Sequence, residues 1–535
     1  MAETTLITTP GDDPDGDATV LDRLAQALAA RNRELCTLKT FYDGQEKVPT
    51  ESLPPNTGVE GSHMYRHYVE LARLDLARPI ADAVSQRQKP NGFRLVGDKT
   101  KRSTEADDMW KRARMPLTAT DMFRDVSKYG ASYALVTATG QPSRVTRLSP
   151  WVCITSDDEQ SALVYTYDET ESKEHLVLYR LIRAEDGSVD RVYSRVATKD
   201  AQERSLIAEE DKESVYRQAN ESASHAPAFE PGFAWEGEKS QDGYEFAKTC
   251  GTLPVVRMAS HDGAGQFEPH LSTLRRIDQE LFQRLCIASL QAFRQRAIKN
   301  LPSAYGKDDP LVKAGKHKAG DPIDYTEIFS QGPNTLWLLP KEAEIWESQI
   351  TDIQPFLSSV KDDVKYLAAS SNTPLDILSP DVQGSAEGAS LKREGLVAKV
   401  EENNTRANDS FVRIMRLALT AAGNRQAVDQ QFETVWLPIN PPNVLEQAQA
   451  ASYARNSLPV KTQWRLIWGM SEAEMAEAET DMTDMAFQQA WARNLQAMDG
   501  QLIQDQDATD GLDHGAQPEP MPDTEPAGDE EGPRP

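Results

Sequence analysis

The amino-acid sequence predicts an α+β fold that is mainly helical. Glu268 to Lys299 repeats apolar residues at spacings of three and four, and so does Leu396 to Ala418. Between Tyr133 and Val196 the pattern changes to short alternating apolar and polar runs. Spacing of three and four is typical of one helix face, and alternation is typical of strands. The sequence therefore indicates two long helices and an antiparallel sheet.

The first part of the chain is predicted to be helical. A helix ends before the turn at Asp43 and Gly44, and a second helical stretch from Tyr65 to Gln88 is expected to break near Pro79, because proline removes a backbone donor. One face of the first helix is marked by Leu21, Leu24, Leu28, Leu35 and Leu38.

The sheet is assigned to three alternating segments: Leu163 to Tyr167, His175 to Ile182, and Val189 to Val196. Leu253 to Met258 is expected to be a returning strand. The polar stretch Ala201 to Gly251 between them is expected to be loops and an insertion.

The chain has 535 residues and a formal net charge of −26. This length suits several domains, and this charge argues against a basic, sequence-specific DNA binder, whose affinity comes from neutralising phosphates. The sequence has no apolar run of the ~20 residues that a bilayer requires, and no basic-then-apolar signal at its start, so a soluble protein without membrane contact is expected.

Both ends are acidic. Gln501 to Pro535 carries ten acids and one arginine, interleaved with Gly and Pro, and is expected to be a disordered acidic tail. Met1 to Val20 carries five acids and no base and is expected to be flexible.

The sequence contains no strong motif for a catalytic, metal-binding or phosphate-binding site. The cysteines are far apart and form no Cys-x-x-Cys pair, so reduced, mostly buried thiols are expected. His63 and His67 lie one helical turn apart, but the Glu of a zinc hydrolase is missing. Gly315 and Lys316 lack the first glycine and the hydroxyl of a phosphate loop. No catalytic residue, cofactor site or metal site is predicted.

A loop is predicted between the two long helical regions. Pro374 and Pro380 disfavour helix at the residues before them, and Gly384 and Gly388 relax the backbone. Ser385 is a candidate N-cap for the long helix that follows.

This helix, loop and long helix resemble the core of tailed-bacteriophage portal proteins, the ring-shaped vertex proteins through which DNA enters and leaves the capsid. The resemblance rests on Gly384 to Lys399, with further similar segments in the same order at Thr40 to Gly44, Asp125 to Val136 and Asn440 to Glu446. With the amphipathic helix before the first segment and the C-terminal helices after the last, they span roughly Leu21 to Leu495.

The resemblance implies a portal fold with wing, stem, clip and a C-terminal helical crown. The implied regions are 1–20 flexible N-terminus, 21–267 wing, 268–299 first stem helix, 300–350 clip, 351–373 second stem helix, 374–390 tunnel loop, 391–440 long helix and return to the wing, 441–500 crown, and 501–535 acidic tail.

The resemblance also implies roles for three groups of residues. The tip of the tunnel loop facing DNA is Ser379, Pro380, Asp381, Val382, Gln383, Gly384 and Ser385. The clip residues for docking are Lys313, Lys316 and Lys318. The stem-packing residues are Leu274, Ile277, Leu281 and Leu285.

The function that the resemblance implies is a homo-oligomeric ring, twelve or thirteen subunits in that family and a dodecamer here, at one capsid vertex of the virion. Double-stranded DNA would pass through it without sequence preference. The expected partners are the terminase large subunit, a head-tail adaptor, and the major capsid and scaffolding proteins, with assembly in the host bacterial cytoplasm.

The alternative is a magnesium-dependent nucleic-acid-processing enzyme. That reading needs carboxylates gathered in one pocket-forming motif, whereas the acids here are spread over helix faces and tails. The chain is therefore expected not to be an enzyme, and the mass of its assembly in solution separates the two hypotheses.

Overall fold

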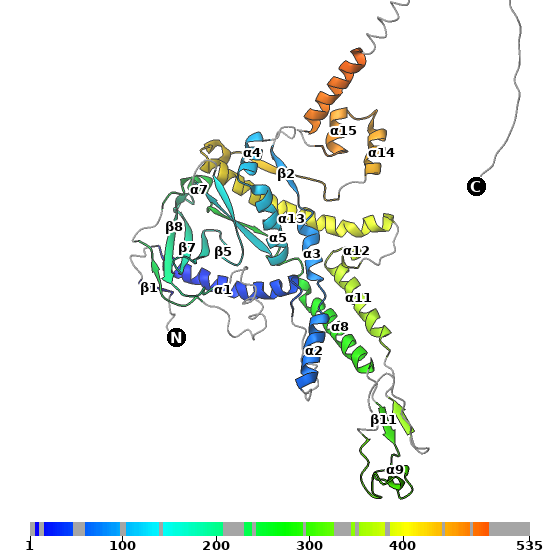
Figure 1. Cartoon of the computed structure of the whole chain (residues 1–535). Coiled ribbons are helices and arrows are strands. Elements are labelled where there is room, and N and C mark those ends of the chain that lie inside the picture. The colour runs from blue at the N-terminus through cyan, green and yellow to red at the C-terminus, as the bar shows by residue number, and fades with distance from the viewer. Residues whose placement is uncertain are drawn as a thin grey trace, which may run out of the picture. The chain divides into compact units, whose positions relative to one another are not determined.

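A computed structural model describes most of the chain, which divides into two compact units, Met1–Asn440 and Pro441–Pro535. Figure 1 shows their elements, coloured from the N-terminus to the C-terminus. The described residues are 6–9, 15–46, 59–96, 103–138, 143–206, 229–237, 242–292, 296–325, 344–347, 352–379, 386–440, 444–470 and 474–491.

The first helix, α1 (Asp17–Tyr42), forms as predicted, and the leucines of its predicted face are buried. The residues before it differ from the expectation of a flexible end. Leu6 and Ile7 are buried, and β1 (Ile7–Thr9) pairs in parallel with β9 (Phe233–Trp235). This segment is ordered because it pairs with a strand far along the chain, and the composition of the segment does not reveal such a partner.

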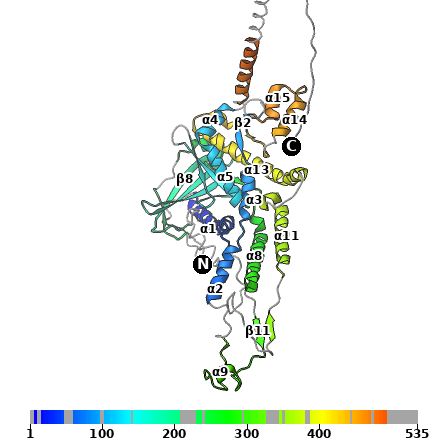
Figure 2. The ribbon, with the colours of Figure 1, turned by 45° about the vertical axis from the view of Figure 1, so that its right-hand side comes forward.

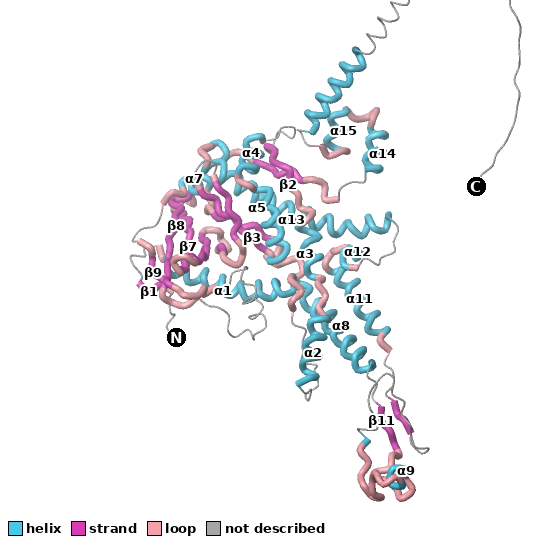
Figure 3. The backbone as a smooth tube through the Cα atoms, in the orientation of Figure 1, coloured by secondary structure: helices cyan, strands magenta, loops and turns pink. Residues whose placement is uncertain are grey.

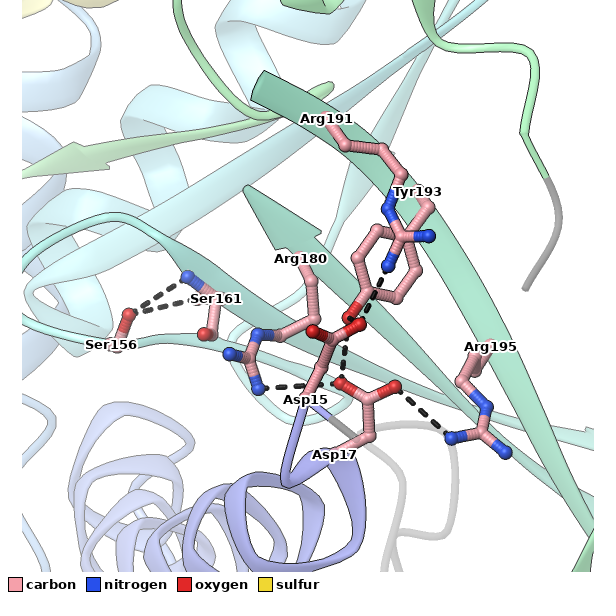
Figure 4. Close-up of polar contacts among 8 residues, drawn as sticks. All are labelled: Asp15, Asp17, Ser156, Ser161, Arg180, Arg191, Tyr193 and Arg195. Atoms are coloured by element: carbon pink, nitrogen blue, oxygen red, sulfur yellow. Dashed lines mark hydrogen bonds and ion pairs between the residues drawn. The ribbon is translucent and has the colours of Figure 1, made fainter. Parts of the chain in front are cut away.

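Asp17 fixes the start of α1 to the sheet. Its carboxylate is 2% exposed and accepts hydrogen bonds from Tyr193 Oη at 2.9 Å and Arg195 Nη1 at 3.1 Å, with Arg180 Nη1 at 3.4 Å. Figure 4 shows these side chains converging from neighbouring strands, with Asp15 bonded to Arg191 beside them. Asp15 and Asp17 therefore make specific ion pairs with residues of the sheet.

Two helices follow, α2 (Val59–Leu71) and α3 (Ala77–Ser85). The break between them lies before Ala77 and not at Pro79, which sits in the first turn of α3. Proline is tolerated there because the N–H groups of a first turn have no partner within the helix. At the break, Leu74 N donates to Asp278 Oδ1 at 3.0 Å, which is a tertiary contact.

The strands form two larger antiparallel-dominated sheets where one was expected. One sheet has six strands in the order β1-β9-β8-β7-β6-β5, and the other has three in the order β10-β3-β4. Figure 3 shows the strands in magenta. Their bounds are β3 Ala131–Thr137, β4 Arg144–Leu148, β5 Cys153–Thr155, β6 Ser161–Asp168, β7 Lys173–Arg183, β8 Val189–Asp200 and β10 Val255–Ala259. The predicted alternating segments are β6, β7 and β8, and the predicted returning strand is β10, which joins the smaller sheet.

The stretch from Ala201 to Gly251 contains more than loops, because it includes β9 and the short helix α7 (Glu245–Cys250). A further two-stranded ladder joins β2 (Pro90–Leu95) to β13 (Phe432–Trp436).

The main core lies around the long helix α13 (Ala386–Ala421), which meets α4 (Thr104–Arg112) and the smaller sheet. Its predicted apolar face is buried from Leu396 to Ala418. Phe411 is fully buried and makes edge-on ring contacts with Trp110 at 5.0 Å and Phe123 at 5.6 Å. The predicted helix periodicity is thus confirmed.

Helix α5 (Met115–Tyr129) runs straight into β3 through Gly130, whose φ is 81°. A Cβ atom at this position would lie 2.0 Å from the backbone oxygen of Gly263. Glycine is therefore required both by the left-handed backbone and by this close approach.

Helix α8 (Leu271–Ala292) is shorter than the predicted span 268–299, which is a correction to the first stem helix. Residues 268–270 form a 3-10 turn, and β11 (Arg296–Lys299) pairs antiparallel with β12 (Glu344–Glu347). The register sets Arg296 opposite Glu347 and Lys299 opposite Glu344. The opposite charges of Lys299 and Glu344 favour this ladder, and its partners lie too far apart in sequence for a helical repeat.

Helix α11 (Gln354–Ser370) occupies the predicted second stem segment, and α2, α8 and α11 lie side by side in Figures 1 and 2. The second unit contains α14 (Val444–Ala454), α15 (Val460–Leu466) and a helix over residues 474–491. The predicted acidic tail, 501–535, lies outside the described residues. Helices and antiparallel sheets together give an α+β fold, as predicted.

Within the described parts of the chain, no helix combines the length and the apolar character needed to cross a membrane. The cysteines are free thiols, with Cys36 and Cys153 buried and the other two partly buried. Burial raises the pKa of the Cys36 thiol to about 11, so it stays protonated at neutral pH.

Candidate channel and docking elements

The two helices predicted to form the stem, α8 and α11, pack through an apolar seam. Leu274 and Ile277 of α8 are buried in one core cluster with Val364 and Leu367 of α11, and Leu281 borders it. Further along α8, the side chain of Leu285 packs against a separate small cluster with α2. The spacing in the sequence therefore placed these side chains on a buried face.

A bidentate ion pair joins the same two helices. Arg276 Nε lies 2.6 Å from Asp363 Oδ2, and Arg276 Nη2 lies 2.7 Å from Asp363 Oδ1. The Asp363 side chain is 12% exposed. A planar fork of this kind fixes orientation as well as distance, so it sets the register of α8 against α11. Neither residue stood out in the sequence, because charges on amphipathic helices usually face solvent.

The end of α11 is hydrogen-bonded to α13. Lys399 Nζ donates to the backbone oxygen of Ser371 at 3.0 Å, and burial lowers the pKa of Lys399 to about 8. Asn372 has a φ of 51°, and a Cβ at Gly395 would lie 3.3 Å from its Oδ1. The chain thus leaves the stem through a tight turn that packs directly on the long helix.

The predicted tunnel loop, 374–390, is shorter in the structure. A turn of helix, α12 (Leu375–Leu378), follows Pro374, and α13 already begins at Ala386. Asp376 accepts from Arg393 Nη2 at 3.2 Å, which links α12 to α13. Of the predicted tip, only Ser379 is described; Pro380, Asp381, Val382, Gln383, Gly384 and Ser385 lie outside the described residues.

The predicted clip lysines gather around a short helix, α9 (Pro310–Lys313), and Lys313, Lys316 and Lys318 are all exposed. Asp309 N-caps this helix, accepting from Leu311 N at 2.9 Å. Acidic residues lie beside these lysines, and the prediction of a basic docking loop did not include them. Lys313 Nζ lies 3.2 Å from Asp308 Oδ1, and Lys318 N donates to Asp321 Oδ2 at 2.8 Å. Residues 301–325 contain four lysines and four aspartates, so the surface is of mixed charge without a basic excess.

Metal chemistry has no candidate ligand set in the described ranges, where no three His, Cys, Asp or Glu residues are grouped to hold an ion. The side chain of His63 lies outside the described residues, so the pair with His67 is not tested. The magnesium-enzyme alternative therefore gains no site from these residues.

One comparison with known proteins supports the portal resemblance. Residues 341–486 match the model of the family described as phage portal protein, SPP1 Gp6-like. A solved chain from the neck of an empty GTA particle is 12% identical, covers 79% of this chain and 97% of its own, and superposes with a TM-score of 0.34. At that TM-score the likeness carries no argument. No curated protein sequence matches this chain.

The matched segment contains α11, the predicted tunnel loop, α13, α14, α15 and most of the helix over residues 474–491. Two of the four segments that carry the resemblance, Gly384 to Lys399 and Asn440 to Glu446, lie within it. The resemblance to phage portal proteins is therefore confirmed, and over residues 341–486 the chain carries the sequence pattern of the SPP1 Gp6-like portal family.

Proposed function

We propose that this chain is the subunit of a portal ring at one vertex of a phage-type capsid, and that double-stranded DNA passes through the ring during packaging and ejection. The observation that carries the proposal is the portal-family match over residues 341–486. The packing and ion pair between α8 and α11, and the bond from Lys399 to Ser371, support the proposal. They hold the helices on either side of the predicted loop in fixed positions.

The proposed mechanism is positional and electrostatic. A conduit must let a polyanion slide in both directions, so dense Lys or Arg contacts would trap it. The net charge of −26 suits a lining that holds DNA weakly and keeps it centred. The loop tip, from Ser379 to Ser385, contains one acid and no base and is proposed to face the channel.

The first test is the mass of the purified full-length protein in solution. A ring of about a dozen subunits, the number implied by the resemblance, is expected. A monomer or dimer at high protein concentration would contradict the proposal.

The loop role is tested separately by deleting Asp381 to Gly384. Because the stem and the Lys399 contact lie outside the deletion, ring mass should stay unchanged while the yield of DNA-filled particles falls. Filled particles at the normal yield would show that the loop does not act on DNA.

The clip is proposed to dock the terminase large subunit and later a head-tail adaptor. Reversal of Lys313, Lys316 and Lys318 to Glu should slow association and leave the ring intact, since exposed charges act mainly on association rate. The matched control reverses three exposed bases elsewhere in the first unit, Lys111, Lys248 and Arg425. Equal association rates for both triple variants would reject the docking assignment.

A further inference from the structure

A cavity of about 380 Å³ lies in the first unit between α1, β5 and the small sheet, apart from the stem, loop and clip. A helix and strands of two sheets line this cavity. The lining side chains of one element share a face, because residues two apart on a strand, or three or four apart on a helix, lie on the same face. The polar and sulfur-bearing residues at its wall are Arg31, Glu34, Tyr133, Cys153, Thr155, Asp157 and Arg257.

Arg257 is held in this wall by its backbone. In the ladder between β10 and β3 it lies directly opposite Tyr133, so the two side chains project on the same face. Ser410 Oγ donates to its backbone oxygen at 3.2 Å. Its Nε is buried and has no hydrogen-bond partner among the described residues. That nitrogen is closed to solvent, so the donors left for an added acceptor are the two Nη atoms, which have no hydrogen bond among the described residues and are not closed off.

A second polar group lies at the same wall. Thr155 is 7% exposed, and its Oγ1 has no hydrogen bond of normal geometry within the described chain. The hydroxyl of Tyr133 lies nearby. Burial raises the pKa of Tyr133, while the charges of Arg257 and Arg31 and the neighbouring Thr155 hydroxyl lower it in part. Two hydroxyls and a guanidinium therefore face one small space.

The other charges at this cavity are already engaged or lie at its rim. Arg31 is paired with Glu34, and its Nη2 donates to the backbone oxygens of Tyr129 at 2.7 Å and Gly263 at 3.3 Å. Asp157 is exposed, and no ion pair joins it to Arg257 in the described residues. Arg257 is thus the cation in this wall whose side-chain N–H groups have no hydrogen-bond acceptor among the described residues.

We infer that this cavity binds an oxyanion of the carboxylate or phosphate class, with the Arg257 guanidinium supplying the charge and the hydroxyls of Thr155 and Tyr133 supplying further donors. A guanidinium presents its N–H groups as a planar fork that fits two oxygens of such a group. The volume suits a small anion or one acidic side chain of a second copy of the chain. Its chemistry is independent of the proposed channel function.

The test measures the melting temperature of the full-length protein during titration with inorganic phosphate or acetate at constant ionic strength, with chloride as the balancing salt. Wild type is expected to be stabilised, and Arg257→Gln is expected to weaken the apparent affinity by about tenfold or more, the scale of a charged hydrogen bond. Thr155→Val should weaken it less. The matched control is Arg144→Gln, an exposed arginine of the same sheet outside the cavity, which should titrate like wild type.

A second readout distinguishes the sources of the oxyanion. If free anions give no shift, but Arg257→Gln lowers the mass of the assembly and Arg144→Gln does not, the oxyanion is a carboxylate of a second copy. Arg257→Lys, which keeps the charge and loses the fork, replaces Arg257→Gln if the latter does not fold. No anion-dependent shift together with an unchanged assembly mass would overturn the inference.

Discussion

The two units of the chain differ in where their apolar side chains go. The first unit holds all five hydrophobic core clusters found in the described residues. In the described part of the second unit, Gln463 is the only buried residue, whereas Tyr453 is 87% exposed and Trp491 is 61% exposed. The first unit is therefore stabilised by its own core. The described part of the second unit has no such core, and exposed apolar side chains on this scale are typical of a contact surface.

The largest expected effect comes from comparing one phenylalanine in each unit. Phe411→Ala removes a fully buried ring from between Trp110 and Phe123 and should lower the free energy of unfolding by about 3–5 kcal/mol. Phe487→Ala changes a ring that is 67% exposed and should stay within about 0.5 kcal/mol. Denaturant unfolding measures both, and similar losses would break the distinction between the units.

A smaller but still large effect is expected where α1 begins. Asp17→Asn leaves Arg180 and Arg195 with an uncharged partner in a buried site, which should cost about 3 kcal/mol. Asp15→Asn is the matched control: its ion pair with Arg191 is partly exposed, and its loss should cost at most about 1 kcal/mol. Equal costs for the two variants would show that burial of the Asp17 pair does not contribute.

A pH effect is expected from Asp278 in the first unit, because burial raises its pKa to about 7. The pKa of an unfolded Asp is about 3.9, so between these values the folded state binds a proton that the unfolded state has lost. Stability from this group therefore falls as pH rises, by at most about 1.4 kcal/mol per pH unit. Asp278→Asn should remove that slope between pH 5 and pH 6, and an unaltered slope would reject the assignment.

The smallest effect is expected at the C-terminus. Truncation after Gly500 removes a segment with ten acids and few apolar residues, so the melting temperature and the mass of the assembly should not change. Calorimetry and light scattering check this outcome. A lost assembly would mean that the tail takes part in subunit contacts.

Much of the fold followed from the sequence by itself. The buried face of α1, the α13 face from Leu396 to Ala418 and the strands β6 to β8 were all indicated by apolar spacing. Each depends on residues a few positions apart, because a helix or strand repeats its faces at a fixed period. The order of the portal-like motifs was likewise readable, and the match over residues 341–486 confirmed that resemblance.

Only the tertiary structure decided the contacts that join distant segments. Partners far along the chain determine four features: the strand β1, the end of α8 before β11, the Lys399 bond to Ser371, and the meeting of Arg257 and Thr155 at one cavity. An acid, lysine or arginine has the same local pattern whether it faces solvent or a buried partner. Its role was therefore set by which side chains the fold brought within hydrogen-bond distance, and local periodicity does not contain that information.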